Sequence, residues 1–569
     1  MRRTPRSAKL LACILSLSLF AAACGNDKKK DNSKGKSSKT TEAPTTSKVP
    51  VPKGGTLVIG AEQEPDCADW MGTCGGSSWG YWTMAVHTMP RTFDVVKDNG
   101  KYAYKPNIML KGEPKLETSP KEKVTYEISD KAVWNDGQPI TSTDLKYTWD
   151  QVAKGKDIYD RTGYEKIESV DDSNPKVAVV TFKSPYADWK SLFGGGYGIF
   201  PSHILQGKDR DALMKNGYTF SGGPWVIQKW DKTNQITMIP NAKYWGAKPK
   251  LDKVIFKIQA DTSAEFTAFK SDQVSMIYPQ PQLDAVDQIN AGLPNTQKAI
   301  SPQTGNFEAI WLNNSKAPFN DKAVRQAFAY SLDRKAIVDR LFGKLGVKEP
   351  LNVMNAQIVS DYSDTKAYAG YEKDNAKADK LLTGAGYKKG SDGIYAKGGQ
   401  KLSFAIRSTA GNKRRELTEQ VMQQQLKEAG FEMSIKNAEA GDLFGSLLPK
   451  GDYQAAIYAS VLTGLTPGTC SQFCSTNAPK APDFSGQNWT RTNVKELDPL
   501  LQKVDTELDE GVRKESGKAA DKIMAKNMVT LPLDPLPNIF LWSNKVVGPI
   551  SDNAILGPFW NMNEWGVNS

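Results

Sequence analysis

Alternating apolar and polar residues predict three successive β-strands in the middle of the chain. Val254, Phe256 and Ile258 lie on one face of the third strand, as expected where one side of a sheet is buried. The runs 225–227 and 236–239 are short and rich in residues that favour the strand conformation. This segment therefore predicts part of a β-sheet.

Apolar residues at helical spacing predict helices before and after these strands. Thr141 and Asp144 have the spacing of an N-terminal capping pair, and Asp333 can cap a helix through its own carboxylate. Helical periodicity is present in five segments, which are residues 145–152, 324–332, 376–382, 417–426 and 497–504. Gly430 ends the fourth of these before a strand over 431–435. Helices followed by strands in this way predict an α/β fold.

The first 53 residues have the composition of an export signal followed by a tether. Four basic residues precede the largely apolar run 10–23, which predicts a secretory signal peptide over residues 1–23. That run of 14 residues, interrupted by Ser16 and Ser18, is too short to cross a bilayer, which needs about 20. Residues 24–53 hold almost no large apolar side chain, so they cannot bury enough surface to fold. We expect them to be a disordered tether.

The net charge of +11 is concentrated outside the part that we expect to fold. Residues 1–53 carry 12 basic and 3 acidic side chains, which leaves 62 basic and 60 acidic ones in residues 54–569. A nucleic-acid-binding protein would instead cluster its basic groups on the folded domain. The charge distribution therefore argues against a nucleic-acid partner. The length of 569 residues allows two or three domains.

The cysteines occur in pairs, as expected for an exported protein. Cys67 and Cys74 lie close together in the sequence, as do Cys470 and Cys474. Two local disulfides are the simplest arrangement in an oxidising compartment. A zinc site is the alternative, because a Cys-x3-Cys pair can bind zinc. The chain has only two histidines and no Cys-x2-Cys pair, so we predict no metal site and no cofactor.

One short motif raises the possibility of an enzyme. Residues 76–80 match the G-x-S-x-G pattern of a nucleophile elbow, with Ser78 as the nucleophile. Such an elbow needs a buried strand directly before it, and the preceding residues are instead rich in Asp, Gly and Cys. The base would have to be His87 or His203, and no nearby pattern favours either. A serine hydrolase is therefore an alternative, and we predict no catalytic residue.

Three blocks of the sequence resemble the extracellular solute-binding proteins, family 5, which feed oligopeptide, dipeptide and nickel ABC transporters. The first block runs from Ser221-Gly222-Gly223-Pro224-Trp225 through Tyr244-Trp245-Gly246 to Lys248-Pro249-Lys250-Leu251-Asp252-Lys253-Val254. The second is Asn135-Asp136-Gly137-Gln138-Pro139-Ile140-Thr141. The third runs from Pro318-Phe319-Asn320-Asp321 to Leu332-Asp333-Arg334. The resemblance covers nearly everything from Gly54 to the C-terminus.

The resemblance implies a two-lobed α/β fold of the periplasmic-binding-protein type, class II, in its large form with an extra small domain. Lobe 1 would comprise residues 54–88, 186–300 and 531–569, the small domain residues 89–185, and lobe 2 residues 301–530. It further implies a monomer without enzymatic activity, which captures a solute between the lobes and delivers it to an ABC-transporter permease. The solute is expected to be an oligopeptide. The alternative is a non-peptide solute such as an oligosaccharide or a metal chelate.

The end of the signal peptide resembles the lipobox of bacterial lipoproteins. The small residues 21–23 precede Cys24, although Ala21 stands where that pattern usually has Leu. The resemblance implies that Cys24 is lipidated and becomes the mature N-terminus. The protein would then be anchored on the extracytoplasmic face of the cell membrane.

The resemblance also indicates which residues face the solute. In peptide-binding relatives the strand and loop that match residues 453–467 contact the ligand, and they carry an Asp for its free amino group. Alignment on Pro467 places Thr463 at that Asp, so selection for a free amino end is expected to be weak. The expected ligand-binding residues are Ser77, Ser78, Trp79, Tyr458, Ser460, Leu462, Thr463 and Trp489.

Overall fold

The computed structural model describes residues 50–98, 101–194, 198–279, 283–301, 304–550 and 553–568. The predicted signal peptide, Cys24 and most of the predicted tether lie outside these residues. Within the described ranges, no helix combines the length and the apolar character needed to cross a membrane.

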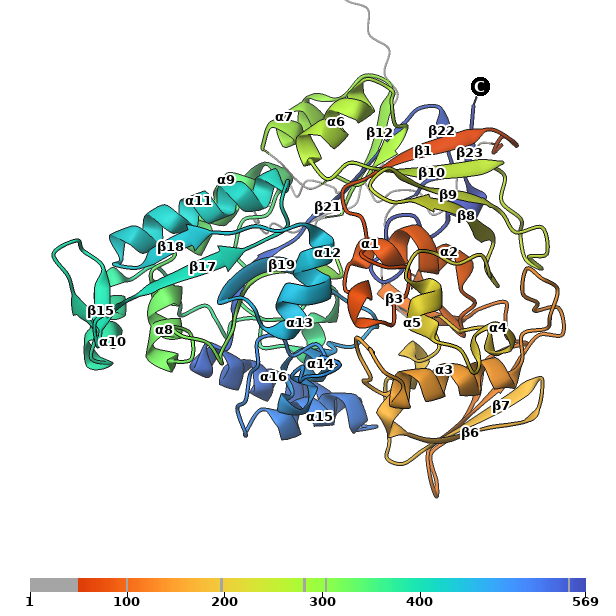
Figure 1. Cartoon of the computed structure of the whole chain (residues 1–569), viewed down its shortest axis with the longest axis horizontal. Coiled ribbons are helices and arrows are strands. Elements are labelled where there is room, and N and C mark those ends of the chain that lie inside the picture. The colour runs from red at the N-terminus through yellow and green to blue at the C-terminus, as the bar shows by residue number, and fades with distance from the viewer. Residues whose placement is uncertain are drawn as a thin grey trace, which may run out of the picture. The chain divides into compact units, whose positions relative to one another are not determined.

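A seven-stranded sheet forms the centre of lobe 1, on the right in Figure 1. Its strands, in spatial order, are β12 (Thr296–Ser301), β21 (Asn538–Ser543), β11 (Met276–Ile277), β1 (Thr56–Ala61), β10 (Lys253–Ile258), β9 (Gln235–Pro240) and β8 (Trp225–Asp231). Strands β1 and β10 are parallel, and β8, β9 and β10 form antiparallel pairs. The three strands predicted between residues 225 and 258 are therefore confirmed. Helices α6 (Thr262–Lys270) and α7 (Leu283–Ala291) follow β10 in the chain.

A four-stranded antiparallel sheet lies between β1 and β8 in the chain. Its order is β4 (Lys115–Glu117), β5 (Lys123–Glu127), β7 (Val177–Phe182) and β6 (Ile167–Asn174), and helix α3 (Ser142–Lys154) packs on it. The carboxylate of Asp144 accepts a hydrogen bond from the backbone N–H of Thr141 at 2.9 Å, so the predicted capping pair is confirmed. Leu145 and Val152 on the predicted helix face are buried. The remaining short elements of lobe 1 are α1 (Ser78–Gly80), α2 (Val86–Thr88), β2 (Phe93–Asp98), β3 (Lys101–Pro106), α4 (Ser202–Leu205), α5 (Arg210–Met214), β22 (Val546–Val547) and β23 (Gly566–Val567).

Lobe 2 is built on a five-stranded sheet, on the left in Figure 1. Its order is β18 (Glu432–Ile435), β17 (Ser403–Arg407), β19 (Ala455–Val461), β13 (Asn306–Leu312) and β20 (Leu531–Pro535). The main helices of this lobe are α8 (Lys322–Tyr330), α9 (Arg334–Phe342), α10 (Asn375–Gly384), α11 (Lys413–Glu428), α15 (Asp498–Thr506) and α16 (Glu510–Asn527). The smaller ones are α12 (Ala440–Asp442), α13 (Leu448–Lys450) and α14 (Thr469–Phe473), and β14 (Lys388–Lys389), β15 (Tyr395–Lys397) and β16 (Gln400–Lys401) form a separate small sheet.

The helices predicted from apolar periodicity in this lobe are confirmed. The carboxylate of Asp333 accepts a hydrogen bond from the N–H of Ala336 at 2.8 Å and caps α9. Val324 and Phe328 of α8 and Met422 of α11 are fully buried, because these helices turn their apolar faces toward the sheet.

Strand β20 lies in lobe 2, although the family resemblance implies that residues from 531 onward belong to lobe 1. It pairs with β13, with Leu531 opposite Ile310. The chain joins the lobe 1 sheet only at β21, which pairs with β11 and β12. The apolar run at 531–533 predicts a strand but not its partner, because every strand of a buried sheet has the same pattern.

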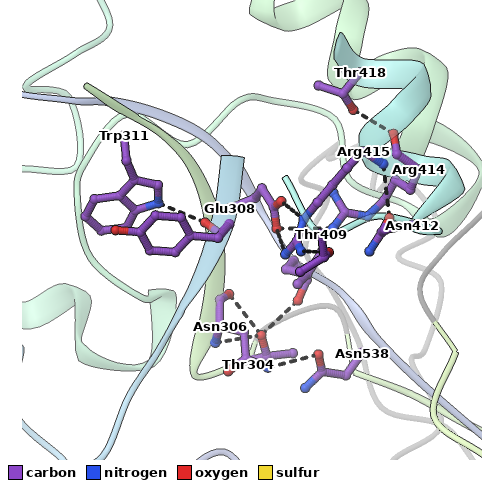
Figure 2. Close-up of polar contacts among 12 residues, drawn as sticks. Thr304, Asn306, Glu308, Trp311, Thr409, Asn412, Arg414, Arg415, Thr418 and Asn538 are labelled. Carbon is purple, nitrogen blue, oxygen red and sulfur yellow. Dashed lines mark hydrogen bonds and ion pairs between the residues drawn. The ribbon is translucent and has the colours of Figure 1, made fainter. Parts of the chain in front are cut away.

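Two short segments connect the lobes, and their described parts, residues 304–305 and 536–537, lie side by side. One joins β12 to β13 and the other joins β20 to β21. The hydroxyl of Thr304 donates to the carbonyl of Leu536 at 2.8 Å, and the Asn306 amide donates to the Asn538 side chain at 3.4 Å. Figure 2 shows Thr304, Asn306 and Asn538 at this place. The lobes are thus joined by a narrow pair of strand connections, as in a hinge.

Candidate functional site

A cavity lies between the two lobes. It encloses about 1680 Å³ of empty space, which includes solvent at its mouth. Lobe 1 contributes the loop 75–78 and residues near 160 and 188, and lobe 2 contributes residues 458–468, Trp489 and Asp505. A ligand in this space would therefore contact both lobes.

Aromatic side chains form one wall of the cavity. Tyr458 stacks on Trp311 with ring centroids 4.6 Å apart, and the Trp311 indole donates to the Tyr458 carbonyl at 2.9 Å. Tyr159 of lobe 1 meets Trp489 of lobe 2 edge to face, with centroids 5.7 Å apart. Phe444 packs against both Tyr458 and Trp489. This wall offers apolar contact surface from both lobes.

Six of the eight expected ligand-binding residues line this cavity. They are Ser77, Ser78, Tyr458, Leu462, Thr463 and Trp489. Trp79 does not line it, because successive residues of a helix point to different sides. Its ring packs in lobe 1 against Trp82 and Phe559 and borders a smaller second cavity. Ser460 does not line it either, because its hydroxyl accepts a hydrogen bond from the Gln472 amide, and Gln472 faces the cavity.

The surroundings of Ser78 do not form a nucleophile elbow. The residues directly before α1 form a short turn of 3₁₀ helix, Thr73–Gly75, rather than a strand. His87 is buried with its Nε2 at 2.9 Å from the carbonyl of Trp82, and burial lowers its pKa to about 3. His203 pairs with Asp136 at 2.8 Å. Among the hydrogen bonds of the described residues, none joins Ser78 to either histidine.

Both pairs of cysteines form disulfides beside loops that line the cavity. Cys67 bonds to Cys74, directly before the loop 75–78, with Cα atoms 5.7 Å apart. Cys470 bonds to Cys474, with Cα atoms 4.7 Å apart, next to the cavity residues 471 and 472. A bonded cysteine has no thiolate to offer zinc, so the zinc alternative is wrong for these four residues. The part of the chain that the structure describes contains no group of three or more His, Cys, Asp or Glu placed to hold a metal ion.

Three aspartates outside the expected ligand-binding residues also line the cavity: Asp160, Asp188 and Asp505. Asp160 accepts hydrogen bonds from Ser471 at 2.7 Å and Gln487 at 2.8 Å, so it connects lobe 1 to lobe 2. Asp188 accepts one from Thr466 at 2.7 Å. The backbone N–H of Ala187 donates to the carbonyl of Asp505 at 2.9 Å, so residues 187–188 touch the end of α15.

Burial raises the pKa of two of these carboxyl groups. The pKa of Asp188 rises to about 6, and burial together with the negative charge of Asp188 raises that of Asp505 to about 8. A signal for Asp505 exists in the sequence, because it directly follows the predicted helix 497–504 and lies four residues after Leu501, on the same face of α15. A carboxylate on a buried helix face needs a partner or a function.

A buried ion-pair network supports the cavity from lobe 2. The Glu308 carboxylate of β13 accepts hydrogen bonds from Nε of Arg415 at 2.5 Å and from Nη2 of Arg414 at 3.1 Å. All three side chains are at most 4% exposed. Burial alone would raise the pKa of Glu308, but the two guanidinium groups outweigh burial and lower it. Figure 2 shows the Glu308 carboxylate beside the side chains of both arginines, and Arg415 also borders the cavity.

Two α/β lobes joined by a pair of strand connections, with a large cavity between them, define a two-lobed solute-binding protein. Residues 106–480 match the family model described as bacterial extracellular solute-binding proteins, family 5 Middle. This match spans more than half of the chain, so the protein belongs to the bacterial extracellular solute-binding proteins, family 5. The predicted family and two-lobed α/β fold are confirmed.

Known proteins similar to this chain bind different solutes. The oligopeptide-binding protein AppA of Bacillus subtilis is 26% identical over 537 residues, which cover 92% of each chain. The structure of AppA with a nonapeptide has a TM-score of 0.81 at 21% identity and covers 91% of this chain and 100% of AppA. An oligopeptide-binding protein of Thermus thermophilus with a pentapeptide has a TM-score of 0.78 at 22% identity and covers 90% and 96% of the chains. The periplasmic EDTA-binding protein EppA has a TM-score of 0.76 at 21% identity and covers 93% and 98%.

Proposed function

We propose that this protein is the substrate-binding component of an ABC importer and that its solute is an oligopeptide. The observation that carries the proposal is the cavity of about 1680 Å³ between the lobes, bounded by both aromatic and polar groups. The likeness to AppA, whose structure holds a nonapeptide, supports the same class of ligand. In this proposal the protein is a carrier and not an enzyme.

Binding closes the two lobes around the peptide. The paired connecting segments at Thr304 and Leu536 act as the hinge, and contacts such as Asp160 with Ser471 hold the closed form. A ligand that touches both lobes stabilises the closed form over the open one, which shifts the equilibrium between them. The permease then receives the closed, loaded protein.

The proposal places the protein at the outer face of the membrane. Residues 1–23 are removed as a signal peptide, Cys24 receives lipid, and residues 24–53 tether a monomer to the bilayer. The division into lobe 1, a small domain over residues 89–185 and lobe 2 is part of the same proposal. It is supported by the separate four-stranded sheet between residues 115 and 182.

A non-peptide solute is the second candidate, and the likeness to the EDTA-binding protein EppA favours it. A chelate or an oligosaccharide would use the same aromatic wall. The two candidates differ in the hydrogen bonds that the cavity must supply. A peptide backbone needs hydrogen-bond donors and acceptors along its whole length.

Mass spectrometry of the solute that copurifies with the protein would separate these candidates. We expect peptides of mixed sequence to be released on denaturation. Titration of the stripped protein with peptide pools should change the fluorescence of its 14 tryptophans, since several of them border the cavity. Binding of sugars or metal chelates with no response to any peptide would contradict the proposed function.

A further inference from the structure

One short segment of lobe 1 is strongly basic. Residues 241–253 connect β9 to β10 and include the start of β10. They hold four lysines and one aspartate: Lys243, Lys248, Lys250, Lys253 and Asp252. Their net charge is therefore +3, whereas residues 54–569 as a whole, with 62 basic and 60 acidic side chains, carry +2. Outside this segment the same range carries −1, so the segment accounts for the whole positive excess.

These positive charges are exposed and are not neutralised by carboxylates. Lys243, Lys248 and Lys250 are exposed, and none of the ion pairs between described residues includes them. Nζ of Lys248 donates to the carbonyl of Ala242 at 2.8 Å, which leaves its charge in place. The carboxylate of Asp252 accepts a hydrogen bond from the backbone N–H of Gly55 at 2.9 Å. The lysines can therefore act together on an anionic partner.

The predicted tether enters lobe 1 beside these lysines. The backbone N–H of Gly54 donates to the carbonyl of Lys250 at 2.8 Å, so the exposed Lys53 adds a further positive charge next to Lys250. Residue 50 follows Cys24 by 26 positions, which gives the tether a reach of at most about 90 Å. The surface at which the tether enters needs the least of this length to touch the bilayer.

Apolar and aromatic side chains lie next to the lysines. Ile108 is 49% exposed and packs on Gly246, where an added Cβ would lie 2.5 Å from Ile108 Cδ1. Tyr244 and Trp245 are half-buried, with ring centroids 5.1 Å apart. Tyr and Trp are common at the membrane–water interface, and lysine side chains extend along apolar groups toward charged headgroups. This combination suits the surface of an anionic bilayer.

We propose that this basic face, formed by Lys53, Lys243, Lys248, Lys250 and Ile108, docks on the anionic headgroups of the membrane that holds the tether. The lysines would lie against lipid phosphates and Ile108 at the headgroup boundary. The inference rests on the proposed placement at the outer face of the membrane and goes beyond it, because a lipid anchor alone sets no orientation. The attraction decreases within a Debye length, about 10 Å at 0.1 M salt, so docking should weaken as salt is added.

Docking in this way would leave the lobes able to open and close. All residues of the basic face belong to lobe 1, and none of them lines the cavity between the lobes. Lobe 2 joins lobe 1 through the paired connecting segments at Thr304 and Leu536, which are not part of this face. Peptide affinity should therefore be the same for free and vesicle-bound protein.

The test uses the Cys24→Ser protein, which keeps the tether and cannot receive lipid. Cosedimentation measures its binding to vesicles of phosphatidylcholine, with and without one third of phosphatidylglycerol. We expect binding only to the anionic vesicles. Replacing Lys243, Lys248 and Lys250 together by glutamine should weaken it at least about tenfold, because each lysine near an anionic surface contributes about fivefold. Ile108→Ser should weaken it at least about threefold through lost apolar contact.

The matched control replaces three lysines of lobe 2 together by glutamine: Lys380, Lys388 and Lys427. These side chains are also exposed and are also outside the ion pairs of the described residues. The control has the same net charge as the triple variant of the basic face, and both keep the lysines of the tether. It should bind anionic vesicles like the parent protein. Thermal unfolding confirms that each variant is folded.

Three results would overturn the docking. They are no binding of the parent protein to anionic vesicles, equal loss of binding in the two triple variants, and equal affinity for soluble polyphosphate with no effect of Ile108→Ser. The last result would identify a soluble or cell-wall polyanion as the partner in place of a bilayer. Peptide binding is measured on the same samples and should persist in all three cases. Its loss, with vesicle binding retained, would instead contradict only the proposed function.

Discussion

Replacing Glu308 by alanine should strongly destabilise the protein. The carboxylate holds two guanidinium groups at 2.5 and 3.1 Å, and both arginines are almost completely buried, since Arg414 is 0% and Arg415 4% exposed. Removing one partner of a buried ion pair costs about 3–5 kcal/mol, because the remaining charge stays buried. Here two buried guanidinium groups lose the same carboxylate, so we expect a loss at the upper end of this range, about 5 kcal/mol. A domain of ordinary stability has about 5–15 kcal/mol in total.

Urea unfolding at pH 7 measures this loss as a lower midpoint with an unchanged slope. The matched control is Asp339→Asn, which breaks the exposed pair between Lys335 and Asp339 on α9. Both side chains of that pair are about half exposed, so the control should lose no more than about 0.5 kcal/mol. If Glu308→Ala lost less than about 1 kcal/mol, our view that the two arginines stay desolvated would be wrong.

Three further predictions concern the pH response, the anchor and the cysteines. Asp505 has a pKa near 8 in the folded protein and 3.8 ordinarily, so its contribution to stability is present below pH 3.8 and is lost as the pH rises toward 8. Asp505→Asn should remove this decline, which thermal unfolding across pH 4–8 measures, and parallel curves for both proteins would contradict it. Cys24→Ser should release the protein into the medium. Retention of this variant on the membrane at the wild-type level would refute the anchor. Replacing Cys67 and Cys74 by serine should cost about 2–3 kcal/mol at most, because the disulfide closes a short loop, and a larger loss would show additional packing at the sulfurs.

The local elements of the fold could be predicted from the sequence because their signals are local. The cap of α3 depends on residues three positions apart, and β10 shows its buried face through Val254 and Phe256. The sheet that β20 joins could not be predicted in this way. Its partner β13 lies more than 200 residues away, and an apolar run does not identify the strand that it pairs with.

Only part of the candidate site could be predicted from the sequence, because the rest depends on contacts between distant segments. Resemblance indicated the loop with Ser77 and Ser78 and the segment with Tyr458, and these residues border the cavity. It did not indicate Asp160, Asp188 and Asp505, which come from three distant segments. Their proximity is produced by the packing of the lobes, and only the position of Asp505 directly after the predicted helix was visible beforehand.

The position of the two disulfides has a consequence for how tightly the protein can hold its solute. Each bond restrains a loop that borders the cavity, one in each lobe, before any ligand arrives. Ordering a free loop at the moment of binding would cost about 1–2 kcal/mol of conformational entropy for each residue. Loops that are already restrained avoid most of that cost, so the binding surface is preorganised. The oxidising compartment would then set the affinity and the residence time of the solute, and a reduced protein that remained folded would release it sooner.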